Sequence, residues 1–230
     1  MSQAEELHFF NKLAKDWWDP EGPQAMLHKI NPLRVRWMSR SVDLKGLKVL
    51  DVGCGAGILS EALAEQGADV TGIDLGESLI QVAQSRGKNV KYQCVSIADF
   101  AKKHTAQFDC VACLEMLEHV EDFAAILQEI SKVLKPGGFV FLSTLDRTPR
   151  SFVEAIVGAE YLLKLVPKGT HHYDQFIRPD ELCEGMRNAG LEPHSMTGLR
   201  YHPLLKTFSL VPKPQTNYWV VGQKSGDSSF

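Results

Sequence analysis

The sequence predicts an α/β fold built on a doubly wound, mainly parallel sheet of seven strands. Short apolar runs alternate with helical patterns, a glycine-rich turn joins the first run to a helix, and an acid ends the next run. Strands that alternate with helices form parallel sheets, because each helix carries the chain back to the same edge. With 230 residues, 44% of them hydrophobic and 23% charged, the chain is expected to form a single domain, residues 1–230, with one sizeable core.

The glycine-rich turn lies within the segment VLDVGCGAGI, residues 49–58. Residues 48–52 are typical of a buried strand, and residues 58–66 of a helix. Gly53 and Gly55 let the backbone approach a ligand closely, and the start of the helix offers free N–H groups. The spacing G-x-G-x-G differs from the dinucleotide fingerprint G-x-G-x-x-G, which disfavours a hydride-transfer enzyme.

Asp74 ends the second predicted strand, residues 68–74. It lies about 20 residues beyond the glycines, where an acid that binds ribose hydroxyls is expected. The alternative is that Asp74 only caps the helix that begins near Glu77. Because the glycine turn lies at the right distance, the ribose role is favoured.

The rest of the chain continues the same alternation. Residues 1–45 are predicted to be helical, with Asn31-Pro32 starting a helix and Arg34 in its first turn. An arginine early in a helix opposes the dipole, so we expect a carboxylate partner, either on a ligand or in a surface salt bridge. Residues 224–230 are predicted to be a disordered tail. Further strands are predicted at 90–95, 108–114, 139–144, 195–206 and 218–223, and helices at 78–85, 121–134 and 181–188.

Charge and cysteine content exclude some classes of function. A net charge of −3 provides no basic field for nucleic acid, so no such partner is expected. The sequence has neither a signal-peptide pattern nor an apolar run of membrane-spanning length, so a cytoplasmic protein is expected. Cys110 and Cys113 should point to opposite faces of one strand, which favours buried thiols over a metal or redox pair.

An acidic and histidine cluster directly follows the fourth predicted strand, at the edge where open parallel sheets bind ligands. If this stretch is helical, Glu115, Glu118 and His119 share one face and can bind a divalent cation such as magnesium or zinc. The alternative is a site without metal, in which His119 is a general base. His171 lies in a turn expected to fold back over the site, as a further ligand or as the base.

Residues 146–180 are predicted to be an inserted segment around an apolar helix at 151–166. Cationic side chains flank this helix. It is suited to lie on anionic membrane lipids through residues 147–168. A buried lid is the alternative.

Together these segments resemble the class I S-adenosylmethionine-dependent methyltransferases, and most closely the ubiquinone biosynthesis O-methyltransferase family. The glycine turn alone indicates only the superfamily. The resemblance covers residues 9–222, and its more specific motifs are Leu-Glu-Met-Leu-Glu-His and Val-Pro-Lys-Gly-Thr-His. It rests on residues 31–34, 49–58, 113–120, 140–145, 158–161 and 166–171.

The resemblance implies a Rossmann-like methyltransferase fold that binds S-adenosyl-L-methionine. Arg34, Gly53, Asp74 and Leu114 match the family's cofactor-contacting positions. The glycine motif adds Asp51 and Gly55 to these positions, and Ile97 follows the third strand, where this fold commonly places an apolar contact to the adenine.

The implied substrates are a polyprenyl catechol and demethylated ubiquinol, methylated at both O-methylation steps of ubiquinone biosynthesis. The resemblance also implies a peripheral position on the inner face of the cytoplasmic membrane and contact with other proteins of the pathway. The motif Asn/Asp-Pro-Pro-Tyr/Phe of nitrogen methyltransferases is not found in the sequence, which favours an oxygen nucleophile. The alternatives are a soluble catechol or N-methyltransferase and a non-catalytic module that binds S-adenosylmethionine.

Overall fold

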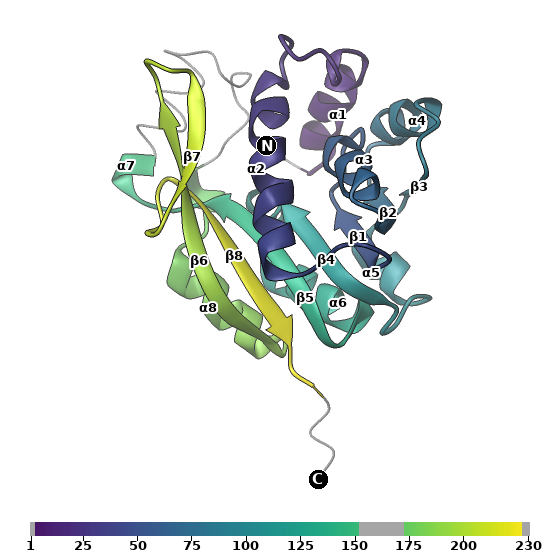
Figure 1. The fold of residues 1–230 in the computed structure, drawn as a ribbon, viewed down its shortest axis with the longest axis vertical. Helices are drawn as coiled ribbons and strands as arrows, with labels where there is room; N and C mark the ends of the chain where they lie inside the picture. Colours follow the sequence, from purple (N-terminus) through teal and green to yellow (C-terminus); the bar gives the residue numbers. More distant parts are fainter. Residues whose placement is uncertain (1–2, 152–172, 227–230) are drawn as a thin grey trace.

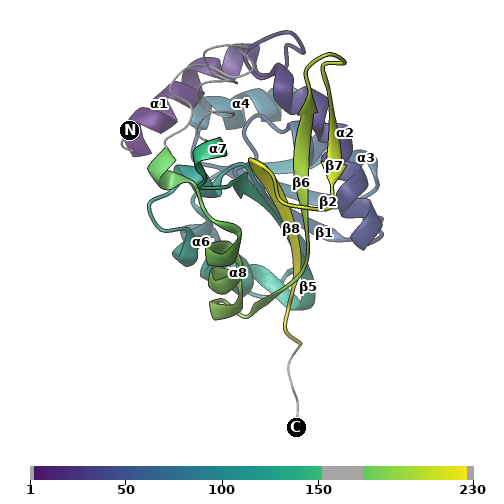
Figure 2. The same cartoon turned by 90° about the vertical axis from the view of Figure 1, so that its left-hand side faces the viewer.

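A single mixed sheet lies at the centre of the protein, with helices on both faces (Figures 1 and 2). The computed structural model describes residues 3–151 and 173–226. In these residues the sheet has eight strands, in the order β3-β2-β1-β4-β5-β8-β6-β7. The strands are β1 (Lys48–Val52), β2 (Asp69–Asp74), β3 (Val90–Cys94), β4 (Phe108–Leu114), β5 (Leu134–Leu145), β6 (Leu191–His202), β7 (Thr207–Val211) and β8 (Asn217–Lys224).

The helices include both α-helices and short 3-10 turns. The predicted helices at 78–85, 121–134 and 181–188 correspond to α4, α6 and α8. The α-helices are α1 (Gln3–Leu13), α2 (Ala25–Ser41), α3 (Ile58–Glu65), α4 (Glu77–Ser85), α5 (Ile97–Ala101), α6 (Phe123–Val133), α7 (Pro149–Ser151) and α8 (Pro179–Asn188). The 3-10 turns are η1 (Ala14–Asp16), η2 (Leu117–His119) and η4 (Tyr173–Gln175).

The predicted mainly parallel α/β sheet is confirmed. Strands β3, β2, β1, β4 and β5 are parallel neighbours, and β8 lies antiparallel between β5 and β6. The described sheet has one strand more than predicted, because the chain turns after His202 and pairs back on β6 as β7. The sequence pattern had placed a single strand at 195–206.

The core lies on both faces of the sheet, as the alternation of side chains along its strands requires. Leu50 and Val52 of β1 pack with α5, α6 and α8, whereas Val49 packs with α2 and α3 on the other face. Cys113 belongs to the first core and Cys110 to the second, so the prediction that these thiols face opposite sides is confirmed. The sheet is therefore covered on both faces where its strands are parallel.

The prediction that a helix starts at Asn31-Pro32 is wrong, because Pro32 lies inside α2. Proline removes the N–H that would bond to the carbonyl of His28, which weakens a helix interior. The helix nevertheless continues, since Ile30 and Met38 are buried in the core on either side of the proline. Arg34 consequently lies in the middle of a helix and not in its first turn.

Part of the predicted insertion lies outside the described residues. This holds for the predicted apolar helix at 151–166 beyond Ser151, for most of the segment 147–168 that is predicted to contact lipids, and for His171. The last four residues of the predicted tail are also outside the description. Among the described residues, none of the helices is long and apolar enough to cross a membrane.

Candidate active site

A pocket of about 330 Å³ lies at the carboxyl ends of β1, β2 and β4. The strand order reverses between β1 and β4, and open parallel sheets bind their ligands at such a reversal. The pocket brings together every described residue that the sequence analysis assigned to the site. These are Arg34, Asp51, Gly53, Gly55, Asp74, Ile97, Leu114, Glu115, Glu118 and His119.

The glycine turn forms one wall of the pocket. Gly53, Gly55 and Gly57 have φ values of +74°, +54° and +91°, in the left-handed region where glycine is favoured. A Cβ atom on Gly55 would lie 2.5 Å from the ring of Trp17. Glycine is therefore required at position 55 both by the backbone conformation and by the packing of the N-terminal segment.

Asp74 supports the glycine turn from the end of β2. Its Oδ2 accepts a hydrogen bond from the Gly55 N–H at 2.9 Å, and its Oδ1 accepts one from the Gly76 N–H at 2.7 Å. Gly76 is the N-cap of α4, so the Oδ1 atom binds the residue that precedes this helix and not an N–H group of its first turn. Burial raises the pKa of Asp74. A carboxylate offers about four acceptor positions, so Asp74 can still accept from a further donor.

Asp51 is a second buried acid in the pocket wall. It accepts a hydrogen bond of 2.6 Å from the Ser60 hydroxyl. Burial raises the pKa of Asp51 to about 6, although the Ser60 hydrogen bond and the charge of Arg34 act in the opposite direction. Near neutral pH this side chain therefore presents a poorly solvated negative charge, which suits a cationic ligand group.

Arg34 has a protein carboxylate as its partner, where the sequence left a ligand or a surface salt bridge open. Its Nη2 lies 3.5 Å from Glu115 Oε1, and both side chains are largely buried. Burial lowers the pKa of Arg34, and the Glu115 charge opposes this. Among the described residues, the buried Nε and Nη2 atoms of Arg34 have no hydrogen-bond partner, so they can donate to a further acceptor.

Glu115 is held by residues that the sequence analysis did not identify. The Ser143 hydroxyl donates to its Oε1 at 2.5 Å, and the Asn217 amide donates to its Oε2 at 2.7 Å. Trp219 Nε1 in turn donates to Asn217 Oδ1 at 2.8 Å. These partners come from β5 and β8, far along the chain, and nothing in their local sequence marks them as site residues.

The predicted shared helical face of Glu115, Glu118 and His119 is wrong. Glu115 has a φ of +57°, and the 3-10 turn η2 begins only at Leu117. The left-handed residue turns the chain sharply at the end of β4, so Glu115 and Glu118 reach the pocket from different backbone conformations.

Glu118 is an almost completely buried carboxylate. Its Oε2 accepts a hydrogen bond from the Thr144 hydroxyl at 2.8 Å. Its Oε1 is buried and has no hydrogen-bond partner in the part of the chain that the structure describes. Burial raises the pKa of Glu118, the nearby charge of Glu115 raises it further, and His119 lowers it. Within residues 3–151 and 173–226, no three His, Cys, Asp or Glu side chains are grouped so that they could hold a metal ion.

The N-terminal segment covers the pocket, a feature that the sequence analysis missed. Leu7, Phe10 and Trp17 line the pocket, and the Phe10 ring packs edge-on against His119 at 5.4 Å between centroids. The sequence analysis predicted only helices in residues 1–45 and assigned no role to Trp17 and Trp18. Two adjacent tryptophans are the one signal that pointed to a larger packing role.

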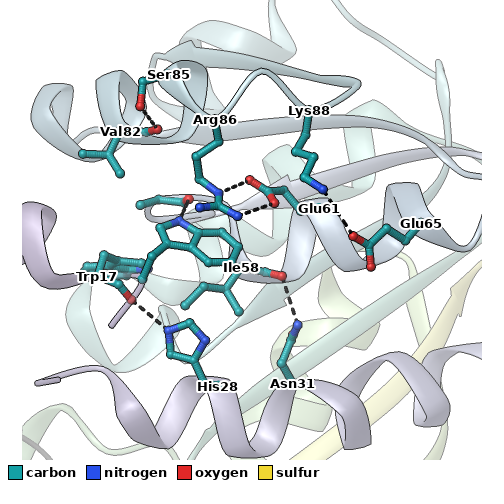
Figure 3. Close-up of polar contacts among 12 residues, drawn as sticks. Trp17, His28, Asn31, Ile58, Glu61, Glu65, Val82, Ser85, Arg86 and Lys88 are labelled. Atoms are coloured by element: carbon teal, nitrogen blue, oxygen red, sulfur yellow. Dashed lines mark hydrogen bonds and ion pairs between the residues drawn. The ribbon is translucent and has the colours of Figure 1, made fainter. Parts of the chain in front are cut away.

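Polar contacts fasten this segment to the glycine turn and to α3 (Figure 3). Trp18 Nε1 donates to the Ala56 carbonyl at 2.8 Å. The Arg86 guanidinium lies 3.3 Å from the Trp18 ring centroid and pairs with the buried Glu61. The N-terminal segment is therefore bound directly to the glycine turn.

Comparison with known proteins agrees with this geometry. Residues 12–196 match the family described as "Methyltransferase domain". A curated ubiquinone biosynthesis O-methyltransferase of Thiobacillus denitrificans is 50% identical over 225 residues, 96% of this chain and 97% of that protein. The protein of the same name from Bordetella avium is 48% identical over 95% of this chain and 93% of its own length. This chain belongs to the ubiquinone biosynthesis O-methyltransferase family.

A solved structure shares the fold of this enzyme. The magnesium protoporphyrin IX methyltransferase of Synechocystis, solved with bound SAH, has a TM-score of 0.71 and 19% identity, and the match covers 97% of this chain and all of that one. The predicted Rossmann-like methyltransferase fold is confirmed. So are the prediction of an enzyme and that of S-adenosylmethionine as its cofactor.

Proposed function

We propose that this O-methyltransferase methylates the phenolic hydroxyls of a polyprenyl catechol and of demethylated ubiquinol, at both O-methylation steps of ubiquinone biosynthesis. The observation that carries the proposal is the single pocket in which the glycine turn and Asp74 meet Glu115, Glu118 and His119. The wall that binds the cofactor thus faces side chains that can accept or donate a proton. The names of the relatives support the choice of substrate.

The cofactor is held by the wall built from β1, β2 and α2. Asp74 accepts hydrogen bonds from the ribose hydroxyls, and Ile97 packs against the adenine. Gly53 and Gly55 let the backbone lie close to the cofactor, and Leu114 fills the wall beside it. At the methionine end, Arg34 Nε and Nη2, which make no hydrogen bond within the described residues, bind the carboxylate, and Asp51 attracts the amino group.

The chain's own side chains prepare the phenol for methyl transfer. When bound, S-adenosylmethionine supplies an electrophilic methyl group on a sulfonium. A phenol is a poor nucleophile until it loses its proton, and His119 accepts that proton as general base, with Glu118 beside it favouring the imidazolium. The O–C bond then forms as the C–S bond breaks, and the pocket holds the oxygen in line with the methyl carbon. His171 is the alternative base.

The described residues contain no group of three side chains already placed to hold a metal ion, so Glu115, Glu118 and His119 would have to move together to bind a divalent cation, magnesium or zinc. A cation held there would favour the phenolate form of a catechol. The unpartnered Oε1 of Glu118, buried near a second carboxylate, supports this ligand set. Glu115 would have to exchange its contacts with Ser143 and Asn217 for the cation. Since His119 cannot be ligand and base through one lone pair, His171 takes the proton in that case.

The enzyme works at the inner face of the cytoplasmic membrane, as a peripheral protein that contacts anionic lipids through residues 147–168. A polyprenyl substrate supports this location, because its chain partitions into the bilayer. Other proteins of the ubiquinone pathway are the expected protein partners.

The test is methyl transfer from labelled S-adenosylmethionine to a short-chain prenyl catechol, with the matching short-chain demethylated quinol as second acceptor. We expect both to be methylated, and loss of the protein from cells to cause accumulation of the demethylated catechol. A chelator should lower turnover, and added magnesium or zinc should restore it. If the chelator left turnover unchanged, a role for the cation would be excluded. If neither acceptor were methylated, the proposed substrates would be refuted.

A further inference from the structure

The turn between β6 and β7, residues 203–206, exposes two adjacent leucines. Leu204 is 99% exposed and Leu205 is 74% exposed, compared with 43% for Leu75, the other large apolar side chain exposed among the described residues. Single exposed leucines are normal on protein surfaces. Two neighbouring ones at the tip of a hairpin, both mostly exposed, indicate a surface that an apolar partner covers.

The charged residues that neighbour this turn in the sequence are all basic. Between Glu192 and Asp227 the sequence contains no acidic residue, although the whole chain has a net charge of −3. Arg200 and Lys206, both exposed, flank the leucines. An apolar tip with cationic neighbours matches an anionic lipid surface, where leucines enter the acyl boundary and cations contact the headgroups.

The sheet topology places this turn at the edge that carries the active site. β6 runs antiparallel to β8, and β8 runs antiparallel to β5, so β6 points in the same direction as the parallel strands. The turn follows the carboxyl end of β6, and the pocket lies at the carboxyl ends of β1, β2 and β4. In Figures 1 and 2 the β6–β7 ribbon extends from the sheet on this side.

We propose that residues 203–206 form a membrane-insertion tip, which places Leu204 and Leu205 in the acyl boundary of an anionic bilayer. Arg200 and Lys206 contact the headgroups, and the pocket edge then faces the membrane. Residues 203–206 are separate in the sequence from residues 147–168. This membrane contact rests on the proposed function in one respect. The polyprenyl chain of the proposed substrate lies in the bilayer, so the edge of the pocket has to face the membrane to receive it.

The test is co-sedimentation of the full chain with vesicles of phosphatidylcholine alone or mixed with phosphatidylglycerol. We expect binding to the mixed vesicles, weakened by salt. The double variant Leu204→Ser/Leu205→Ser should bind on the order of tenfold more weakly, whereas Leu204→Trp should bind at least as well as the parent. Lys206→Gln should bind about fivefold more weakly. Lys102→Gln, the same charge change at the end of α5, should bind like the parent.

Full binding by the double variant, or equal losses for Lys206→Gln and Lys102→Gln, would overturn the proposal. So would a parent protein that binds neither kind of vesicle. A parent dimer in light scattering that the double variant converts to monomer, with vesicle binding unchanged, would assign the tip to a second copy of the chain. Methyl transfer to a soluble short-chain catechol without vesicles tests the proposed function separately, because the double variant should retain it.

Discussion

At the scale of single residues, Glu118 combines complete burial with an unpartnered oxygen. We expect Glu118→Gln to lower turnover by about 100-fold or more, since it removes the negative charge that favours proton transfer to His119. Thr144 can still donate to the amide oxygen, so the fold and the affinity for S-adenosylhomocysteine should change by only a few fold. Steady-state kinetics and calorimetry measure the two effects.

The matched control for Glu118→Gln is Glu184→Gln, which makes the same change on the exposed face of α8. It should leave both turnover and affinity unchanged. If Glu118→Gln also retained full turnover, the cluster after β4 would have no part in the chemistry.

A second prediction for a single residue concerns Asp51 and how its contribution to the free energy of unfolding changes with pH. Because burial raises its pKa from 3.8 to about 6, the folded state holds the proton more tightly than the unfolded state does. Its stabilising contribution is therefore complete below about pH 4 and is lost as the pH rises through about 6, a difference of about 3 kcal/mol. Asp51→Asn should raise the free energy of unfolding by about 2–3 kcal/mol at pH 8, and by much less at pH 4.

Denaturant unfolding at several pH values checks this prediction. Ser60→Ala is the matched variant, because the Ser60 hydroxyl stabilises the ionised form of Asp51. It should lower stability at pH 8 more than at pH 4. A pH-independent effect of Asp51→Asn would show that Asp51 is not desolvated in the folded protein. Asp51→Asn should also weaken cofactor binding, since Asp51 is proposed to attract the amino group.

At the scale of elements, the sequence predicted the regular parts well and the irregular ones poorly. The bounds predicted for β1 and β4 match, because their apolar runs are buried on both faces. The prediction of a helix start at Pro32 failed because tertiary packing of α2 outweighs the preference of proline for the first turn of a helix. The prediction for Glu115 failed for a different reason. Its left-handed φ goes together with side-chain contacts to Ser143 and Asn217, which lie far along the chain and are not encoded in the local sequence.

The site residues show the same difference between what local sequence predicts and what it does not. Residues on the carboxyl ends of strands, such as Asp74 and Leu114, were found because a motif fixes their place relative to the sheet. Phe10 and Trp17 were missed because an N-terminal segment can fold over either face of a sheet, and only long-range packing decides which. The contact between Trp17 and the glycine turn is the result of that choice.

The packing of Trp17 on the glycine turn can be tested by comparing two glycine-to-alanine variants. Gly55 and Gly46 both have a positive φ, but a Cβ on Gly46 has no atom within 4 Å, whereas one on Gly55 meets Trp17. Gly46→Ala should therefore cost only backbone strain, about 1 kcal/mol of unfolding free energy. Gly55→Ala should cost about 2–4 kcal/mol and also weaken cofactor binding. Equal costs in denaturant unfolding would mean that Trp17 does not pack on the turn.

At the scale of the whole molecule, the cofactor pocket joins parts that are distant in the sequence. Its wall combines the N-terminal segment, α2, the first half of the sheet and the turn after β4. A ligand that fills the pocket binds only the assembled protein, so it stabilises all of these parts together. The response to the cofactor product is therefore a property of the complete fold.

We expect S-adenosylhomocysteine at about 100 times its Kd to stabilise the protein by about 2.7 kcal/mol, which raises the Tm by about 5–10 °C for a chain of this size. Asp74→Asn should lose most of this increase, because one of its two side-chain positions becomes a donor and can no longer accept from a ribose hydroxyl. Lys102→Gln, outside the pocket, should keep the full increase. Thermal unfolding with and without the ligand measures all three proteins. An undiminished shift in Asp74→Asn would assign Asp74 to bracing Gly55 and Gly76 alone, and the ribose contact would have to come from another side chain of the pocket.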